Sequence, residues 1–215
     1  MSTTPFIVSL TGPSCAGKST LEQALKTAGF ENVISTTTRA PRAGEIDGQS
    51  YYFIDKSEFK RLRDTGAFIE TVEFNGNYYG VLASEIERLS LMGKPIVVIV
   101  EPEGLRQIVA YCRTHDWPLM KVFVGNPGVV IAKRFLERFV NDVNKAAEGG
   151  TDAERLLAVR TNYANRLGVM LETECWWAED VAIGADLWLK TFDERNIEDV
   201  VNEISRQAVD ALSVV

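Results

Sequence analysis

The sequence contains few of the residues that build disulfide frameworks, metal centres and membrane anchors. Its 215 residues include three widely separated cysteines and a single histidine, so neither a disulfide framework nor a zinc site is expected. The longest strongly apolar run, residues 95–100, is far too short to span a bilayer, and residues 1–10 lack the features of a signal peptide. We therefore expect a cytoplasmic protein with reduced thiols and no membrane partner.

Positive charge is outnumbered by negative charge. Lysine and arginine total 23 against 30 for aspartate and glutamate, which gives a net charge of −7 and argues against a nucleic-acid partner. Hydrophobic residues make up 46% and charged residues 25%, and these near-average values exclude disordered, collagen-like and coiled-coil chains. The length predicts a single domain that carries small insertions.

Strand patterns and helix patterns alternate along most of the chain. Short apolar runs predict buried core strands at residues 6–10, 32–35, 95–100, 119–124 and 186–190. Helical periodicity predicts core helices at residues 18–29, 84–93, 105–112 and 197–208. This alternation predicts an α/β fold, a doubly wound parallel sheet with helices on both faces.

Two segments interrupt the alternation. Residues 35–81 predict a small β-rich insertion, with a basic, turn-rich stretch followed by short strands around a helix at residues 57–65. Two long charged helices are expected within residues 128–170, separated by Gly149 and Gly150. Ser84 with Glu87, and Thr151 with Glu154, have the spacing of capping boxes, so we expect each pair to start a helix.

The segment after the first expected strand carries a motif with a specific chemistry. Residues 12–19, GPSCAGKS, satisfy G-x-x-x-x-G-K-[ST] between a strand and a helix, where the pattern belongs. Its backbone N–H groups surround phosphates, Lys18 reaches the β and γ phosphates, and Ser19 is a candidate Mg²⁺ ligand. The predicted site for a nucleoside triphosphate comprises Gly12, Pro13, Ser14, Cys15, Ala16, Gly17, Lys18, Ser19 and Thr20.

A second phosphate site is indicated by two arginines in the turn-rich stretch. Residues 36–45, TTTRAPRAGE, place Arg39 and Arg42 on either side of a proline, and the guanidinium group suits bidentate phosphate contact. Taken alone, two loop arginines are usually solvated. The motifs that accompany these two arginines in the sequence change that interpretation.

Together these motifs resemble the guanylate kinase family. The resemblance consists of GPS-x-AGKS at residues 12–19, S-x-T-T-R-x-P-R-x-G-E at 35–45, D-G-x-x-Y-x-F at 47–53, F-I-E at 68–70 and G-N-Y-Y-G at 76–80. The motifs cover about the first hundred residues in order, and the remainder matches more loosely. The resemblance implies an ATP- and Mg²⁺-dependent nucleoside monophosphate kinase that makes ADP and GDP or dGDP from ATP and GMP or dGMP.

The resemblance also implies roles at the acceptor site. Two arginines and two tyrosines would hold the monophosphate, and Glu70 would accept hydrogen bonds from guanine N1–H and the 2-amino group, a donor pair that adenine lacks. The implied substrate-binding set is Ser35, Arg39, Arg42, Glu45, Tyr51, Glu70, Tyr79, Val81 and Glu101. The alternatives are that the tyrosines are core aromatics and that Glu70 is an edge-strand charge.

Arginines in the two long helices resemble the family's lid, which closes over the transferring phosphate. Arg134 and Arg138 lie four residues apart, hence on one helix face, and Arg160 lies on the next helix. With Lys18 they form the predicted catalytic set, which neutralises the transferred phosphoryl group and excludes water. The lid is longer than usual, so an alternative alignment places Lys145 and Gly149 at the first two arginine positions.

Two departures from the family concern the base and the metal. Val81 stands where the family has a small hydroxyl residue, and valine cannot donate to the purine 6-oxo group. The family's D-x-D-x-x-G becomes residues 99–104, IVEPEG, so the first acid is Ile99 and only Glu101 matches. Whether Glu103 compensates is open at this point.

These observations predict one domain with three parts. The core would comprise residues 1–34, 82–127 and 166–215, the acceptor-binding insertion residues 35–81 and the lid residues 128–165. The expected partners are small-molecule nucleotides, and the sequence leaves monomer and homodimer open. The alternatives are a nucleotide kinase for a modified purine or a pyrimidine, or a noncatalytic guanylate-kinase-like binding module.

Overall fold

The computed structural model describes residues 4–41, 44–74, 76–147, 153–174, 177, 184–190 and 196–213. A five-stranded sheet with the order β2-β7-β1-β8-β9 forms its centre, and every neighbouring pair is parallel. The strands are β1 (Ile7–Thr11), β2 (Glu31–Asn32), β7 (Ile96–Ile99), β8 (Leu119–Val124) and β9 (Leu187–Leu189). The predicted parallel sheet is confirmed, with the β-branched run of β7 inside it.

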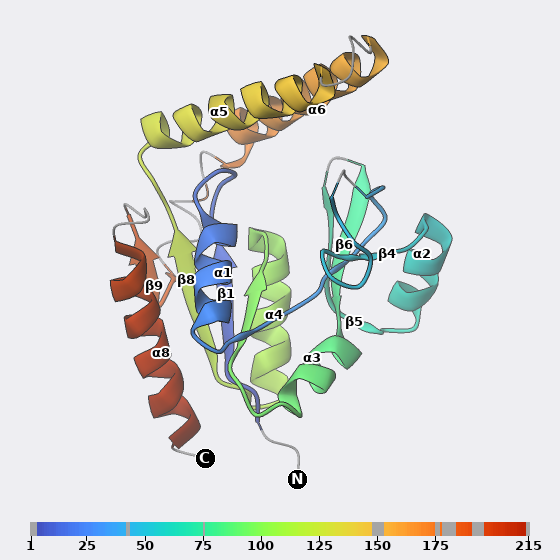
Figure 1. Cartoon of the computed structure of the whole chain (residues 1–215). Helices are drawn as coiled ribbons and strands as arrows, with labels where there is room; N and C mark the ends of the chain where they lie inside the picture. The colour runs from blue at the N-terminus through green and yellow to red at the C-terminus, as the bar shows by residue number, and fades with distance from the viewer. Residues whose placement is uncertain are drawn as a thin grey trace.

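Helices cover both faces of this sheet (Figure 1). The helices α1 (Lys18–Thr27) and α8 (Ile197–Ser213) pack on one face, and α3 (Ala83–Ser90) and α4 (Pro102–Thr114) lie on the other. Successive β1 side chains divide between two hydrophobic clusters, with Val8 in one and Ile7 in the other. This two-sided burial explains the uninterrupted apolar runs of the core strands.

A separate four-stranded mixed sheet stands beside the core, with the order β4-β3-β6-β5. Its strands are β3 (Thr36–Thr37), β4 (Tyr52–Phe53), β5 (Phe68–Phe74) and β6 (Asn77–Leu82), and α2 (Lys56–Asp64) packs on it. Phe59 of α2 stacks on Phe68 and Tyr78 with ring centroids 4.5 and 5.4 Å apart. This sheet therefore has its own small core.

Two long antiparallel helices, α5 (Gly128–Ala147) and α6 (Ala153–Glu172), extend over the carboxyl ends of the central strands (Figure 1). The rings of Phe135 and Phe139 pack against Tyr163, at 5.2 and 5.0 Å between centroids. Among the described residues of these helices, only Phe135 and Tyr163 are buried. We call α5 and α6 the lid helices.

Two local predictions were wrong. Ser84 does not cap α3, because the helix begins at Ala83 directly after β6 and the Ala83 N–H donates to the Ala67 carbonyl at 2.9 Å. The strand expected at 32–35 ends early, because the Ile34 N–H donates to the Glu85 carboxylate at 3.2 Å. The cap predicted at Thr151 lies outside the described residues. In the described part of the chain, no helix is long and apolar enough to cross a membrane.

Candidate active site

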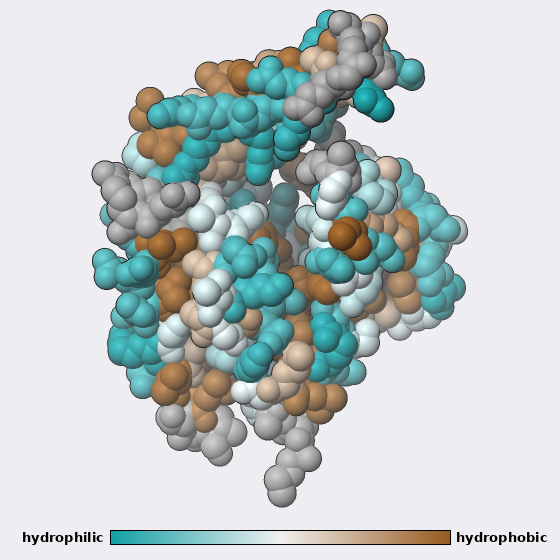
Figure 2. Space-filling model, in the orientation of Figure 1, coloured by the Kyte–Doolittle hydropathy of each residue, from teal (hydrophilic) through white to brown (hydrophobic). Residues whose placement is uncertain are grey.

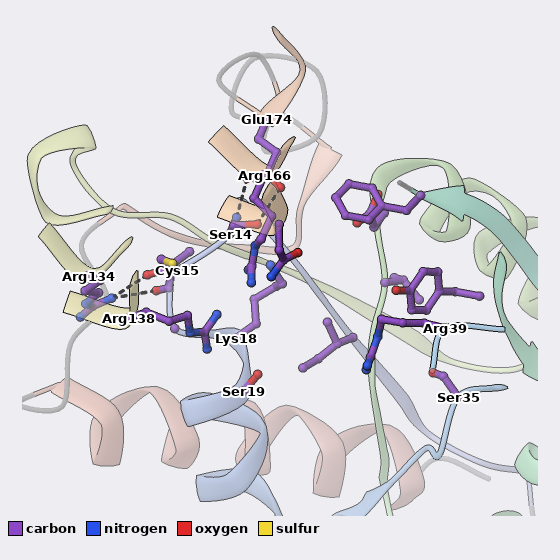
Figure 3. Close-up of a pocket in the computed structure, with 18 of the residues that line it drawn as sticks. Ser14, Cys15, Lys18, Ser19, Ser35, Arg39, Arg134, Arg138, Arg166 and Glu174 are labelled. Carbon is purple, nitrogen blue, oxygen red and sulfur yellow. Dashed lines mark hydrogen bonds between the residues drawn. The ribbon is translucent and has the colours of Figure 1, made fainter. Parts of the chain in front are cut away.

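A cavity of about 980 Å³ lies between the central sheet, the small sheet and the lid helices. The hollow that leads into it is visible in Figure 2. Figure 3 shows that charged side chains enter it from all three parts of the fold. The cavity is therefore large enough, and charged enough, to hold polar ligands.

One end of the cavity is formed by residues 12–19, which connect β1 to the N-terminus of α1. The loop depends on two of its glycines. A Cβ at Gly12 would lie 2.1 Å from the Val124 carbonyl oxygen, and Gly17 starts α1 with φ 107° in the left-handed region. The close approach of loop and β8 turns the backbone toward the helix N-terminus, which is a geometry that binds anions.

Lys18 lies within this loop and is turned back onto it. Its Nζ donates to the carbonyl oxygens of Gly12 at 2.5 Å and Pro13 at 3.0 Å. Burial lowers the pKa of Lys18, and the charges of Glu174 and Glu101 act in the opposite direction. The ammonium group is thus held where it can turn toward a phosphate. Ser19, the first exposed residue of α1, also lines the cavity.

The opposite end is formed by the small sheet. Arg39 makes two 2.9 Å hydrogen bonds to the Glu45 carboxylate, and its guanidinium carbon lies 5.4 Å from the centre of the Tyr51 ring. Tyr51 in turn contacts the Tyr79 ring edge-on at 6.2 Å. Glu45 therefore fixes the arginine, which points with the two tyrosines and Ser35 into the cavity.

Glu70 lies deeper in the same cavity, at a bulge in the pairing of β5 with β6. Its side chain is 5% exposed, and burial together with the charge of Glu101 raises the pKa of Glu70 to about 7, although the backbone N–H of Val81 opposes the shift. Gly104 of α4 leaves the space that this carboxylate occupies, because a Cβ there would lie 2.6 Å from Glu70 Oε2. The arrangement is a buried acceptor facing a polar cavity.

The lid helices contribute three arginines. Arg134 donates to the carbonyl oxygens of Ala16 at 3.1 Å and Cys15 at 3.4 Å, which ties α5 to the phosphate loop. Arg138 and Arg166 line the cavity (Figure 3). Positive charge therefore faces the phosphate loop from the opposite side of the cavity.

Comparison with known proteins identifies the family of the chain. The model of the guanylate kinase family matches residues 2–163. The guanylate kinase of Nostoc sp. is 36% identical over 160 residues, which cover 74% of this chain and 73% of that protein. That of Synechocystis sp. is 44% identical over 164 residues, which cover 74% and 78%. This chain belongs to the guanylate kinase family.

Other guanylate kinase matches differ in extent. For the enzyme of Bartonella henselae, 44% identity extends over 104 residues, so the alignment spans about half of each chain, 48% of this one and 47% of that one. The crystal structure of guanylate kinase from Anaplasma phagocytophilum has a TM-score of 0.60 at 23% identity and covers 98% of this chain and 88% of that one. The fold is therefore shared along nearly the whole chain.

Most residues that the guanylate kinase motifs predicted meet in the cavity. Of the predicted donor site, all but Gly12 and Pro13 line it, and those two shape the loop. Of the predicted acceptor site, the lining residues are Ser35, Arg39, Tyr51, Glu70, Tyr79 and Glu101. Arg42 lies outside the described residues.

Besides Gly12 and Pro13, three described residues of the predicted set do not line the cavity. Glu45 acts through its ion pair with Arg39. Val81 is fully buried in the hydrophobic cluster beneath α3 and α4. Arg160 is exposed. It lies three residues before the buried Tyr163 and Arg166 lies three residues after it, so the two arginines are on different flanks of α6. Of the two, only Arg166 lines the cavity. Arg134, Arg138 and Lys145 do line it, while Gly149 of the alternative alignment lies outside the described residues.

The acid after β7 is Glu101. Burial raises the pKa of Glu101 to about 7, Lys18 opposes the shift and Glu174 adds to it. Ile99, at the position of the missing family acid, lines the cavity, whereas Glu103 does not and instead pairs with Arg106 at 2.6 Å. Glu103 therefore does not replace the missing acid in this conformation.

Sequence reasoning missed Glu174. It follows α6 and is 4% exposed, and its carboxylate accepts hydrogen bonds from Ser14 N–H at 2.7 Å and Ser14 Oγ at 2.8 Å. Figure 3 shows it reaching the phosphate loop from the lid side. No motif surrounds this residue, so the sequence carried no signal for the contact.

Proposed function

We propose that the protein transfers the γ-phosphate of ATP to GMP or dGMP, giving ADP and GDP or dGDP. The observation that carries the proposal is that Glu70 and the phosphate loop open into one cavity, with Arg39, Tyr51 and Tyr79 also facing it. A base reader, an acceptor-phosphate site and a donor-phosphate site are then present together. Family membership supports the same activity.

Guanine recognition rests on the environment of Glu70. A buried carboxylate left without donors is costly, and guanine offers N1–H and the 2-amino group as a matched pair. Adenine would present an acceptor and leave the carboxylate unsatisfied, which is the type of mismatch that produces strong discrimination. Ser35 would provide a further polar contact from the small sheet.

The donor phosphates would bind to residues 14–20 with Lys18 on the β and γ oxygens. The donor set also fits Mg²⁺, which usually takes one or two protein oxygens and completes its shell with phosphates and water. Ser19 Oγ is exposed on the cavity wall, and Glu101 lies beside Lys18. Bound Mg²⁺ would supply charge neutralisation at the β and γ phosphates.

We divide the chain for this function into a core of residues 1–34, 82–127 and 166–215, an acceptor-binding insertion of residues 35–81 and a lid of residues 128–165. Arg134 and Arg138 would turn toward the transferring phosphate when the lid closes, and closure would exclude water, which otherwise competes as acceptor. Arg166 of α6 lines the same cavity and would approach the same phosphates. The reaction would need positioning and charge stabilisation, with no covalent intermediate.

The second candidate is a kinase for a modified purine or a pyrimidine nucleotide. It is favoured by Val81, whose buried apolar side chain offers no donor to the 6-oxo group of guanine. It keeps every assignment at the phosphate sites and changes the base. A noncatalytic module is disfavoured, because a complete phosphate loop with its lysine has little use in one.

A coupled ADP-release assay tests the proposal, with ATP and Mg²⁺ against GMP, dGMP, AMP, CMP, UMP, dUMP and dTMP. We expect GMP and dGMP to be preferred and the preference to be lost in Glu70→Ala. Activity with another base alone would overturn the guanine assignment. Absence of ADP formation across the panel would overturn the kinase itself.

A further inference from the structure

Gln107 of α4 completes the hydrogen bonding of an edge strand. Its Oε1 accepts from the Thr71 N–H at 2.9 Å and its Nε2 donates to the Thr71 carbonyl at 3.1 Å. Thr71 lies on β5, the last strand in the order of the small sheet. The side-chain amide thus satisfies the pair of backbone groups that a neighbouring strand would otherwise satisfy.

This contact lies next to the base-reading carboxylate. Thr71 directly follows Glu70 in the chain. Gly104 lies one helical turn before Gln107, and a Cβ added to it would lie only 2.6 Å from Glu70 Oε2. The helix α4 therefore contacts two successive residues of β5. Gly104 packs closely against Glu70 because it has no side chain, and the amide of Gln107 hydrogen-bonds to Thr71. Because α4 packs on the central sheet, these contacts tie Glu70 to the core that carries the phosphate loop.

We infer that Gln107 is a positioning residue for guanine recognition, which acts by fixing the backbone of Thr71 and so the carboxylate of Glu70. The inference rests on the proposed function. Two hydrogen bonds from one carboxylate to N1–H and the 2-amino group require a single geometry, and a displacement of about 1 Å weakens such a contact strongly. Loss of the two hydrogen bonds between Gln107 and Thr71 raises KM for GMP and leaves the ATP site unchanged.

Steady-state kinetics of Gln107→Met and Gln107→Ala test this role. Methionine keeps the length of the side chain without its hydrogen bonds, so it separates positioning from packing. We expect KM for GMP to rise on the order of tenfold in both variants, with KM for ATP unchanged. Arg113→Ala is the matched control, because Arg113 is exposed in the last turn of the same helix.

The outcomes distinguish this inference from the proposed function. A wild type without GMP activity would overturn the proposed function and the role of Gln107 with it. An active wild type and a Gln107→Met variant with an unchanged KM for GMP would overturn the role of Gln107 alone. Equal increases of KM for GMP and ATP, with a lowered melting temperature, would assign Gln107 to general stability.

A second, independent observation concerns Glu174. Its carboxylate takes the Ser14 backbone N–H and hydroxyl at 2.7 and 2.8 Å, beside the ammonium of Lys18. These are the kinds of donor that a phosphate loop offers to a nucleotide. With the carboxylate bound, at least one backbone donor of the loop is occupied by the chain itself.

We propose that Glu174 is an internal ligand of the phosphate loop, which takes the place of a nucleotide phosphate group in the empty protein and leaves when ATP binds. Two anions cannot share the same donors, so ATP competes with the carboxylate. Because Glu174 lies two residues after the end of α6, its release frees one attachment of the lid helices to the loop. Binding of ATP is thereby linked to the freedom of the lid to move.

Calorimetric titration of Glu174→Gln with ATP and with ADP, in the absence of GMP, tests this proposal. Removing the negative charge weakens the competitor, so we expect the Kd for both nucleotides to fall, roughly tenfold if the occupied form predominates. The shorter side chain of Glu174→Asp should act in the same direction. The control is Glu172→Gln, an exposed carboxylate at the end of α6.

An unchanged or increased Kd in both Glu174 variants would overturn this proposal, because Glu174 would then support the loop and not compete for it. The measurement needs no acceptor nucleotide, so it is decided separately from the identity of the base. Melting curves of the variants without nucleotide confirm that each remains folded at the temperature of the titration.

Discussion

The phosphate loop and the lid helices face the same cavity but are held in place differently. The loop is fixed by backbone packing, since Gly12 meets the Val124 carbonyl and Ala16 is fully buried. The lid helices bury Phe135 and Tyr163, while Leu136 and Val140 of α5 remain 60% and 52% exposed. A small buried contact area allows movement, so the loop is preorganised and the lid is adjustable.

Lys18→Ala is the strongest test of the preorganised side. The loop positions this ammonium before substrate arrives, and its loss removes charge stabilisation that no other residue of the loop supplies. We expect kcat to fall about 1,000-fold, with thermal stability nearly unchanged. Lys26→Ala, in the last turn of the same helix, is the control. A fall of less than tenfold would contradict the role assigned to Lys18.

The lid is tested by two arginines with different surroundings. Arg138 lines the cavity and Arg160 does not, although both were predicted from sequence to be catalytic. If the lid closes without rotating its helices, Arg138→Ala lowers kcat about 100-fold and Arg160→Ala leaves it near the wild-type value. The comparison is made at saturating ATP and GMP. An equal loss in both variants would mean that α6 turns during closure and brings Arg160 inward.

The same difference explains what could be predicted from sequence. The parallel sheet and the phosphate loop depend on local patterns, such as the run of residues 95–100 and the spacing of Gly12 and Gly17. The predicted sheet is confirmed, and the loop lies between β1 and α1 as expected, while its binding of ATP stays a prediction. The contact of Glu174 with Ser14 joins residues that are 160 positions apart, and no periodicity encodes it. The lid faces also depend on packing, because Tyr163 decides which flank of α6 faces the cavity.

The cap predicted at Ser84 failed for a related reason. Sequence spacing describes the donors of one helix in isolation, whereas the Ala83 N–H finds its acceptor in Ala67 on a neighbouring segment. Glu85, in the first turn of the same helix, is buried, and its carboxylate accepts a hydrogen bond from the Ile34 N–H and pairs with Arg88. Long-range partners of this kind must be read from the folded chain.

The smallest expected effect is the pH dependence of GMP binding at Glu70. Like the phosphate loop, this residue is held by contacts with the core. Because the pKa of Glu70 is raised to about 7, the carboxylate is ionised above that pH and protonated below it, and only the ionised form accepts from both guanine donors. We expect KM for GMP to rise by about tenfold for each pH unit below the pKa. Glu70→Gln should lack this component.

The Glu70→Gln control also accounts for the titration of the GMP phosphate group, because the same substrate is used with both proteins. Stability supplies a second readout with the opposite sign. A raised folded-state pKa means that the folded protein binds the proton more tightly, so the free energy of unfolding of the wild type should fall relative to Glu70→Gln as pH rises from about 4.5 to 7. If the free energy of unfolding changes with pH in the same way in both proteins, the pKa of Glu70 is not raised. Glu70 would then be as accessible to solvent as the side chains of the lid, and not preorganised like the phosphate loop.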